Sequence, residues 1–210
     1  MLSRMTVEQF TEALAAATPT PGGGSASAQA GAMAASLIQM MCDLTLGREP
    51  YRAHEEAVQG IRRRAEGLRK DLLALVDRDA QAYDGVVTAR RLPKATDAEK
   101  EARSAALERA NLFAIEAPMA IADACAALMS MASELAYKGN VNVVSDVGTA
   151  ALLAYAGLRG AVLSVRVNLK DVKDEARGER LRDRVRRLEM DAEKLREEAL
   201  TAIYVRTNGR

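Results

Sequence analysis

Hydrophobic residues recur at helical spacing along most of this chain. Val7, Phe10 and Leu14 mark one face of a short helix, which the capping-box pattern Thr-Val-Glu-Gln at 6–9 starts. A long amphipathic stretch follows from about 52 to 91, with aliphatic residues at nearly every third or fourth position. Both patterns predict α-helices.

The second half of the chain continues in the same way. A helix that begins with the capping box at 96–99 is expected to run to about residue 138, interrupted and kinked at Pro118, because an interior proline removes one backbone hydrogen bond. The one candidate strand, at 162–169, has helical neighbours. From residue 181, apolar positions alternate by four and three, which is typical of a seam that packs on the bundle or on a partner chain. We expect an all-α bundle of long, closely packed helices.

The segment 22–42 contains no charged residue, which raises the question of a membrane span. Its length would suffice, because about 20 residues cross a bilayer. Its composition is mostly Ala, Gly, Ser and Gln, and small residues let helix backbones approach closely. We interpret the segment as the central helix of a soluble bundle, contacted on all sides.

The sequence Pro-Thr-Pro-Gly-Gly-Gly-Ser at 19–25 leads into this central helix. Its glycines, Gly22, Gly23 and Gly24, allow positive φ and close approach to another surface or a ligand. Ser25 is expected to cap the helix. The residues leave two interpretations open: a tight turn between packed helices, or a helix N-terminus that binds a carboxylate or phosphate.

A second unusual stretch, Gly-Asn-Val-Asn-Val-Val-Ser-Asp, spans 139–146. One helix ends here, and Ser145 or Asp146 is expected to cap the next. Asn140 and Asn142 add further hydrogen-bond donors and acceptors at the same helix start. The stretch fits a ligand site and a loop held by its own side chains equally well.

Composition indicates a globular protein. The 210 residues are 49% hydrophobic and 28% charged, which suits one domain over 1–210 with a charged C-terminal helix over 171–210. A net charge of +1 gives no reason to expect nucleic acid or a membrane surface as a partner. Cys42 and Cys125 lie in apolar runs, and a single histidine leaves too few ligands for a structural zinc site. Buried free thiols and the lack of an apolar signal-peptide stretch predict a cytoplasmic protein.

Four motifs, taken together, resemble the cyclodeaminase/cyclohydrolase family. In chain order they are Pro-Thr-Pro-Gly-Gly-Gly-Ser at 19–25, Asp-Ala-Gln-Ala-Tyr at 79–83, Ala-Pro-Met at 117–119 and Gly-Asn-Val-Asn-Val-Val-Ser-Asp at 139–146. The family includes the cyclodeaminase half of formiminotransferase-cyclodeaminase and the stand-alone bacterial methenyltetrahydrofolate cyclohydrolases. The likeness extends from about residue 10 to 169, and the segments 92–100 and 153–159 are most similar to the stand-alone cyclohydrolases.

The resemblance implies a homodimeric helical fold that acts on a one-carbon-loaded tetrahydrofolate, without metal and without a permanently bound cofactor. Hydrolysis of 5,10-methenyltetrahydrofolate needs a carboxylate that orients and deprotonates water and favours the cationic carbon. It also needs a proton donor for the departing nitrogen. Asp146 and Asp79 are the candidate catalytic carboxylates.

The other candidate residues are assigned to substrate binding. Asn140 and Asn142 supply the paired donors and acceptors that a pterin needs. The anionic glutamate tail suits the helix start at 22–25, with Lys138 as an additional cation. Tyr83, from the 79–83 motif, and Ser145, from the polar stretch, complete the set.

Other functions stay open at this level. The same site could convert 5-formiminotetrahydrofolate with release of ammonia, which is the cyclodeaminase reaction. Alternatives of other classes are a helical protein that binds folate without turning it over, and an assembly module whose charged C-terminal helix pairs chains. The polar cluster around Asn140 favours a ligand over assembly alone, because burying unpartnered Asn and Asp side chains costs free energy.

Overall fold

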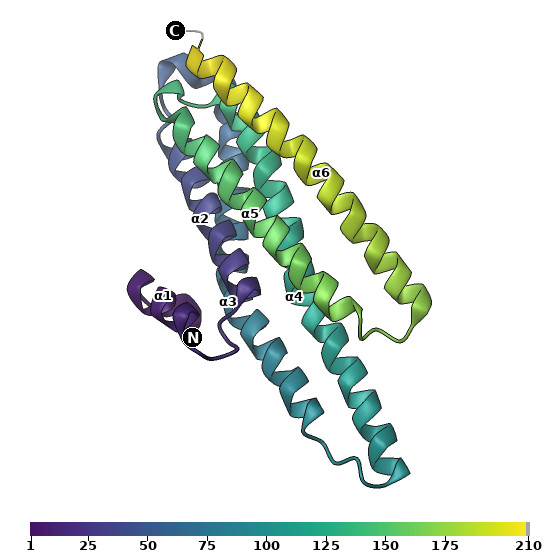
Figure 1. Ribbon diagram of the computed structural model, residues 1–210. Coiled ribbons are helices and arrows are strands. Elements are labelled where there is room, and N and C mark those ends of the chain that lie inside the picture. Colours follow the sequence, from purple (N-terminus) through teal and green to yellow (C-terminus); the bar gives the residue numbers. More distant parts are fainter. Residues whose placement is uncertain (209–210) are drawn as a thin grey trace.

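The computed structural model describes residues 1–208, and the described chain is helical with no strand (Figure 1). Its α-helices are α1 (Val7–Ala15), α2 (Gly23–Asp43), α3 (Glu55–Arg90), α4 (Asp97–Lys138), α5 (Val144–Leu169) and α6 (Glu175–Asn208). Short 3₁₀ helices lie at Leu2–Arg4, Glu49–His54 and Val141–Val143. The candidate strand at 162–169 is part of α5, and the all-α prediction is confirmed.

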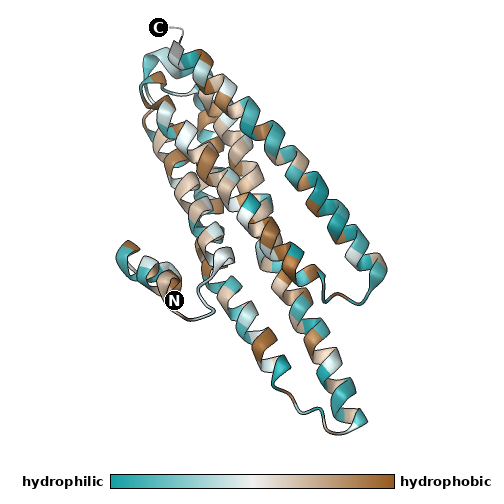
Figure 2. Ribbon diagram, viewed as in Figure 1, coloured by the Kyte–Doolittle hydropathy of each residue, from teal (hydrophilic) through white to brown (hydrophobic). Residues whose placement is uncertain are grey.

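Helices α2 to α5 form the bundle, and α6 lies along α4 and α5 (Figure 1). Figure 2 shows α6 as mostly hydrophilic with isolated hydrophobic residues along it. Of these, Val185, Ala192 and Ala199 are buried against the bundle, so the predicted seam packs within the chain. The short α1 lies beside the N-terminal end of α2 and buries Phe10.

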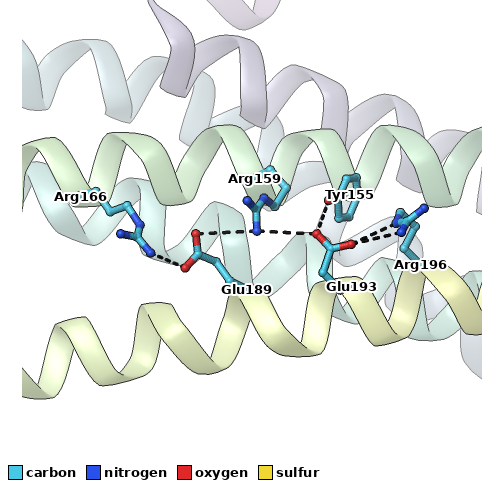
Figure 3. A network of polar contacts seen from close by, with 6 residues as sticks. All are labelled: Tyr155, Arg159, Arg166, Glu189, Glu193 and Arg196. Atoms are coloured by element: carbon cyan, nitrogen blue, oxygen red, sulfur yellow. Dashed lines mark hydrogen bonds and ion pairs between the residues drawn. The ribbon is translucent and has the colours of Figure 1, made fainter.

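Ion pairs on the α5–α6 surface reinforce this packing (Figure 3). Glu189 of α6 forms ion pairs with both Arg159 and Arg166 of α5. The distance from the Glu189 carboxylate to the Arg159 guanidinium is 3.7 Å. Glu193 accepts a 2.5 Å hydrogen bond from the hydroxyl of Tyr155, which raises the pKa of Tyr155 and lowers the pKa of Glu193. Exposed pairs of this kind contribute little singly, so α6 is held mainly by its buried apolar residues.

Small residues let α2, α4 and α5 approach one another closely. A Cβ added to Gly157 of α5 would lie 2.9 Å from the Cys125 sulfur of α4 and 2.9 Å from the Ser27 carbonyl oxygen of α2. Burial raises the pKa of the Cys125 thiol to about 12. The pKa of the Cys42 thiol is also raised to about 12, mainly by burial. Both cysteines are buried free thiols, as predicted.

Several local predictions were wrong at helix ends. The N-cap of α2 is Gly22 and that of α5 is Val143, so neither Ser25 nor Ser145 nor Asp146 caps a helix. The glycines of the 19–25 motif all avoid positive φ, which occurs only at Gly47 among the described residues. The capping boxes at 6–9 and 96–99 are present as predicted.

Two predictions about helix interiors also need correction. Helix α4 continues through Pro118 without interruption, because its long buried face holds both sides of the proline in one helix. The central helix α2 is not contacted on all sides: Met33 and Met40 are 45% and 37% exposed. On α5, which packs against α2, Leu152, Leu163 and Val167 are also exposed.

Candidate functional site

The N-terminus of α2 faces a carboxylate from α3. Asp79 lies against Gly24, where an added Cβ would be 2.5 Å from the carboxyl carbon. The hydroxyl of Ser25 lies 3.1 Å from Asp79 Oδ2 and 3.0 Å from the Val76 carbonyl oxygen. Gly24 is therefore glycine because the Asp79 side chain occupies the space of its missing Cβ.

Two opposing effects set the protonation of Asp79. Burial raises its pKa above the ordinary aspartate value, while hydrogen bonds from the Ser25 hydroxyl and backbone N–H act in the lowering direction and only partly offset it. The single hydroxyl proton of Ser25 can go to Val76 or to Asp79, so a protonated Asp79 can donate to Ser25 while Ser25 donates to Val76. A partly buried carboxyl group with a raised pKa and a hydroxyl partner that can donate or accept is suited to acid–base chemistry.

Asp79 lines a cavity of about 210 Å³ at this end of the bundle. Tyr83, one helical turn after Asp79 on α3, lines it as well and is 38% exposed. Gly22 and Gly24 contribute from the 19–25 motif, in which the Thr20–Pro21 peptide bond is cis. The 19–25 and 79–83 motifs are thus brought together, as a common site requires.

The cavity also has lining residues that the sequence motifs did not identify. Ser164, Val167 and Asn168 of α5 form one wall, and Ala114 of α4 closes the wall beside them. The side-chain amide of Asn168 donates a 3.0 Å hydrogen bond to the Ala114 carbonyl oxygen. The one available signal was Asn168 itself, an uncharged polar residue between Val167 and Leu169.

Asn140 holds the polar loop together through its own hydrogen bonds. It is 2% exposed; its backbone N–H donates to Thr45 Oγ1 and its side-chain amide to the Leu44 carbonyl oxygen, both at 2.9 Å. Its side-chain oxygen, Oδ1, accepts from the Asn142 backbone N–H at 3.0 Å and from the Tyr51 hydroxyl at 3.4 Å. This side chain has a structural role, and its binding of a pterin stays a prediction.

The remaining residues of the polar stretch are more accessible. Ser145 and Asn142 are exposed, and Asp146 is partly buried in the first turn of α5, where the helix dipole favours a negative charge. Lys138 forms a 2.6 Å ion pair with Glu134 one turn before it. Arg206 of α6 donates to the Tyr137 and Gly139 carbonyl oxygens and ties the C-terminal helix to this loop.

The two candidate clusters lie at opposite ends of α2 within one chain (Figure 1). Helix α2 has 21 residues, so its ends are about 30 Å apart at 1.5 Å per residue. Asp79 and Asp146 therefore do not share a site within one chain. Within one chain, Lys138 is also too far from the helix start at 22–25 to assist anion binding there. The Asp79 carboxylate already lies against that helix start and would repel a second anion.

The chain resembles known proteins along most of its length. The family model described as Formiminotransferase-cyclodeaminase matches residues 6–187. A methenyltetrahydrofolate cyclohydrolase of Methylorubrum extorquens is 40% identical over 189 residues, covering 90% of this chain and 89% of that protein. A formimidoyltransferase-cyclodeaminase of Sus scrofa is 34% identical over 77% of this chain and 30% of its own length.

The fold has a counterpart among solved structures. A formiminotetrahydrofolate cyclodeaminase from Thermotoga maritima superposes with a TM-score of 0.87 at 26% sequence identity. The superposition covers 97% of this chain and 98% of that chain. The arrangement of helices, including α6, is therefore shared almost completely.

Proposed function

This chain belongs to the formiminotransferase-cyclodeaminase family, as its motifs predicted, and we propose that it is a methenyltetrahydrofolate cyclohydrolase. Such an enzyme hydrolyses 5,10-methenyltetrahydrofolate to 10-formyltetrahydrofolate. Support comes from the stand-alone M. extorquens cyclohydrolase, which this chain matches along nearly its whole length. The observation that carries the chemistry is Asp79, a partly buried carboxyl group with a raised pKa that lines a cavity.

The reaction proceeds by addition and then cleavage. Ionised Asp79 takes a proton from water as the water oxygen bonds to the carbon between nitrogens 5 and 10, and the C=N electron pair moves to nitrogen. Protonated Asp79 then donates to nitrogen 5 as its bond to carbon breaks. The carbinol hydroxyl loses its proton to solvent and becomes the formyl oxygen. The balance is one water consumed and one proton released, so no permanently bound cofactor is proposed.

A second reaction is supported by the likeness to the formiminotetrahydrofolate cyclodeaminase from T. maritima. In that reaction nitrogen 10 attacks the formimino carbon of 5-formiminotetrahydrofolate, and ammonia leaves after protonation. Asp79 would again move the proton between the two nitrogens. The two reactions differ in their substrate and share the acid–base residue.

The test follows the fading of methenyltetrahydrofolate absorbance with the protein, without it and with Asp79→Asn. We expect the wild type to exceed the spontaneous rate and the variant to lose most of that excess. Ammonia release from 5-formiminotetrahydrofolate is measured in parallel. A rate no faster than the spontaneous one, with ammonia release, would establish the cyclodeaminase; neither activity would leave a folate-binding protein.

We propose further that the protein is a homodimer, joined through the shared face of α2 and α5. These two helices carry exposed apolar side chains, Met33 and Met40 on α2 and Leu152, Leu163 and Val167 on α5. A two-fold axis that lies in this face and runs perpendicular to the helices would cover the face with its own copy. It would also place the Asp79 end of one protomer beside the Asp146 end of its partner.

This arrangement explains why one family motif lies at each end of α2. The active site would take Asp79, Tyr83 and the 22–25 helix start from one protomer. Asn142, Ser145 and Asp146 would come from the partner, with Lys138 as the nearby cation. Asp146 then stabilises the cationic carbon while Asp79 moves the proton.

We assign the protein to the cytoplasm. Among the described residues, α4 and the segment Val141–Leu169 contain windows long and apolar enough to span a membrane, and these are 61% and 44% buried inside the bundle. Helices buried to this extent support a soluble core, and the two free thiols fit a reducing compartment.

A further inference from the structure

We propose that Arg206, near the C-terminal end of α6, is a positioning residue that holds the polar stretch 139–146 in the shape in which it contributes to the active site. This inference rests on the proposed function and on the shared site of the proposed homodimer. The likeness seen in the sequence ends at about residue 169 and the family model at residue 187, so neither covers Arg206. The C-terminal end of α6 lies at the same end of the bundle as the connection from α4 to α5 (Figure 1).

The guanidinium of Arg206 donates hydrogen bonds to two backbone carbonyl oxygens at the end of α4. One belongs to Tyr137, in the last turn of the helix, and the other, at 3.3 Å, belongs to Gly139, its C-cap. The last carbonyl groups of a helix have no partner within the helix, and an arginine side chain is well suited to bind them. The planar guanidinium reaches both oxygens at once, so it fixes the direction in which the chain leaves α4.

The same end of α6 also packs against the residues that follow the polar stretch. A small buried cluster lies here, made of Ala136, Val144, Ala202 and Ile203. A Cβ added to Gly148 of α5 would lie 3.3 Å from the Ile203 Cδ1 atom. Ile203 and Arg206 are three residues apart, so they lie on one face of α6. That face therefore contacts the chain both before and after the segment that carries Asn142.

Arg206 differs from other arginines of the same helix in its partners. Four of them pair with carboxylates: Arg182, Arg184, Arg186 and Arg196. Arg206 is half-buried and forms no ion pair with a described residue, and its bonds go to the backbone instead. A cation at this end of α4 is also favoured by the helix dipole. These contacts indicate that Arg206 holds the main chain of the loop.

Loss of Arg206 should disturb the polar stretch without unfolding it. Asn140 still ties the start of the stretch to the end of α2 through its backbone and side-chain hydrogen bonds. Asp146 lies six residues further along, in the first turn of α5, and its position depends on how α5 leaves the end of α4. A displacement of about 1 Å at a reacting group can cost about a hundredfold in rate. The effect of Arg206 on activity would therefore pass through Asp146.

The first experiment measures kcat, KM and thermal unfolding of Arg206→Ala. We expect kcat to fall about ten- to hundredfold while the protein stays folded at the assay temperature. Arg206→Lys keeps the charge but lacks the planar fork, so it should recover only part of the lost rate. The matched control Arg187→Ala removes an exposed arginine of α6 that has no ion pair with a described residue, and it should keep the wild-type rate. An unchanged kcat in Arg206→Ala, or an equal loss in the control, would overturn the proposal.

The second experiment locates the effect within the dimer. A chain with Arg206→Ala keeps an intact Asp79, so a mixed dimer with an Asp79→Asn chain contains one complete site. Activity should return to about a quarter of the wild-type value, because about half of the dimers are mixed. Mixing with Asp146→Asn chains should restore nothing, because both variants then affect the same half of the site. Failure to recover with Asp79→Asn would mean that the whole Arg206→Ala chain is impaired, and would refute a local role.

The third experiment needs no turnover. Backbone amide hydrogen exchange is compared between the polar stretch 139–146 and the segment 76–83 around Asp79. In Arg206→Ala we expect exchange to become at least about tenfold faster in the first segment and to stay unchanged in the second. Arg187→Ala should change neither. Equal changes in the two segments, or none in 139–146, would contradict the proposed hold on the loop.

The three readouts separate failure of this inference from failure of the proposed function. Wild-type turnover that Arg206→Ala leaves unaffected would reject the positioning role and leave the cyclohydrolase intact. Faster exchange confined to 139–146, with no turnover of either folate by the wild type, would support the hold on the loop and count against the enzyme. If Asp79→Asn and Asp146→Asn chains fail to complement each other while the wild type is active, the stretch does not share the Asp79 site and the inference is wrong.

Discussion

Gly24 differs from the preceding Gly23 in the atoms that surround it. A Cβ at Gly24 would overlap the carboxylate of Asp79, whereas a Cβ at Gly23 would meet nothing within 4 Å. Neither residue has positive φ, so backbone freedom does not explain the glycine at either position. At Gly24 the requirement is space for the Asp79 side chain.

The substitution Gly24→Ala should therefore displace Asp79 and lower kcat by about 10²–10⁴-fold, the usual contribution of a general base. Gly23→Ala is the comparison: its Cβ would meet nothing within 4 Å, so it should leave Asp79 in place, lower kcat far less than Gly24→Ala and stabilise the protein by about 0.4–1 kcal/mol. Steady-state kinetics and thermal unfolding of both variants test this. Equal activity in the two variants would show that Asp79 need not lie against α2.

Asp79→Asn should separate activity from stability. Because the folded state raises the pKa of Asp79, this group's favourable contribution to stability is complete below the ordinary carboxyl pKa of about 3.9 and is lost as pH rises through the folded-state pKa. Above that pH the ionised group destabilises the wild type relative to the variant. We expect the variant to unfold at an equal or higher temperature at pH 7, and to lose this advantage near pH 4.

The pH profile of activity gives the matching kinetic test. In the wild type kcat/KM should rise with pH as Asp79 ionises, and in Asp79→Asn this rise should be absent. Thermal unfolding at several pH values, alongside the two pH–rate profiles, measures both effects. A variant that keeps the same rising limb would assign it to another group.

At the level of elements, small residues set how closely α2 and α5 pack. Gly157 allows α5 to pack directly against the Cys125 sulfur of α4 and the Ser27 backbone of α2. Gly60 on α3 has open space at its Cβ position. The same substitution should therefore have opposite effects on stability at the two sites.

Gly157→Ala should destabilise the protein by about 1–3 kcal/mol, because the added methyl forces the packed helices apart. Gly60→Ala should be neutral or stabilise by up to about 1 kcal/mol, because alanine favours the helix. Chemical denaturation of both variants provides the measurement. Destabilisation at Gly60 equal to that at Gly157 would contradict close packing as the cause.

At the level of the whole molecule, the two candidate carboxylates lie at opposite ends of the bundle. If the active site combines Asp79 of one protomer with Asp146 of the other, a dimer of Asp79→Asn and Asp146→Asn chains contains one intact site. Random mixing makes half of the dimers mixed, so activity should return to about a quarter of the wild-type value. The mixed dimer regains activity because it combines an intact Asp79 on one chain with an intact Asp146 on the other.

The mixing experiment uses the two inactive variants, refolded together and separately. Light scattering on the wild type should give twice the 22.6 kDa chain mass. Activity after mixing that only equals the average of the separate variants would reject the shared site. A monomer at micromolar concentration would reject the dimer as well.

The sequence by itself determined the helices, their capping boxes at 6–9 and 96–99, the all-α class and the family. These features depend on neighbours within a few residues or on motifs spelled out in order, so they can be read without knowing the fold. The apolar seam of α6 was also predictable, because its spacing is a local property.

Only the tertiary structure decided which motifs meet. Asp79 is 54 residues from Ser25, and their contact depends on how α3 packs on α2. The same packing gives Gly24 its role and raises the pKa of Asp79. The separation of Asn140 from that site, and the bonds of Arg206 to the end of α4, are likewise set by helix length and direction. Contacts between residues distant in sequence carry no local signal, because they depend on the whole arrangement of helices.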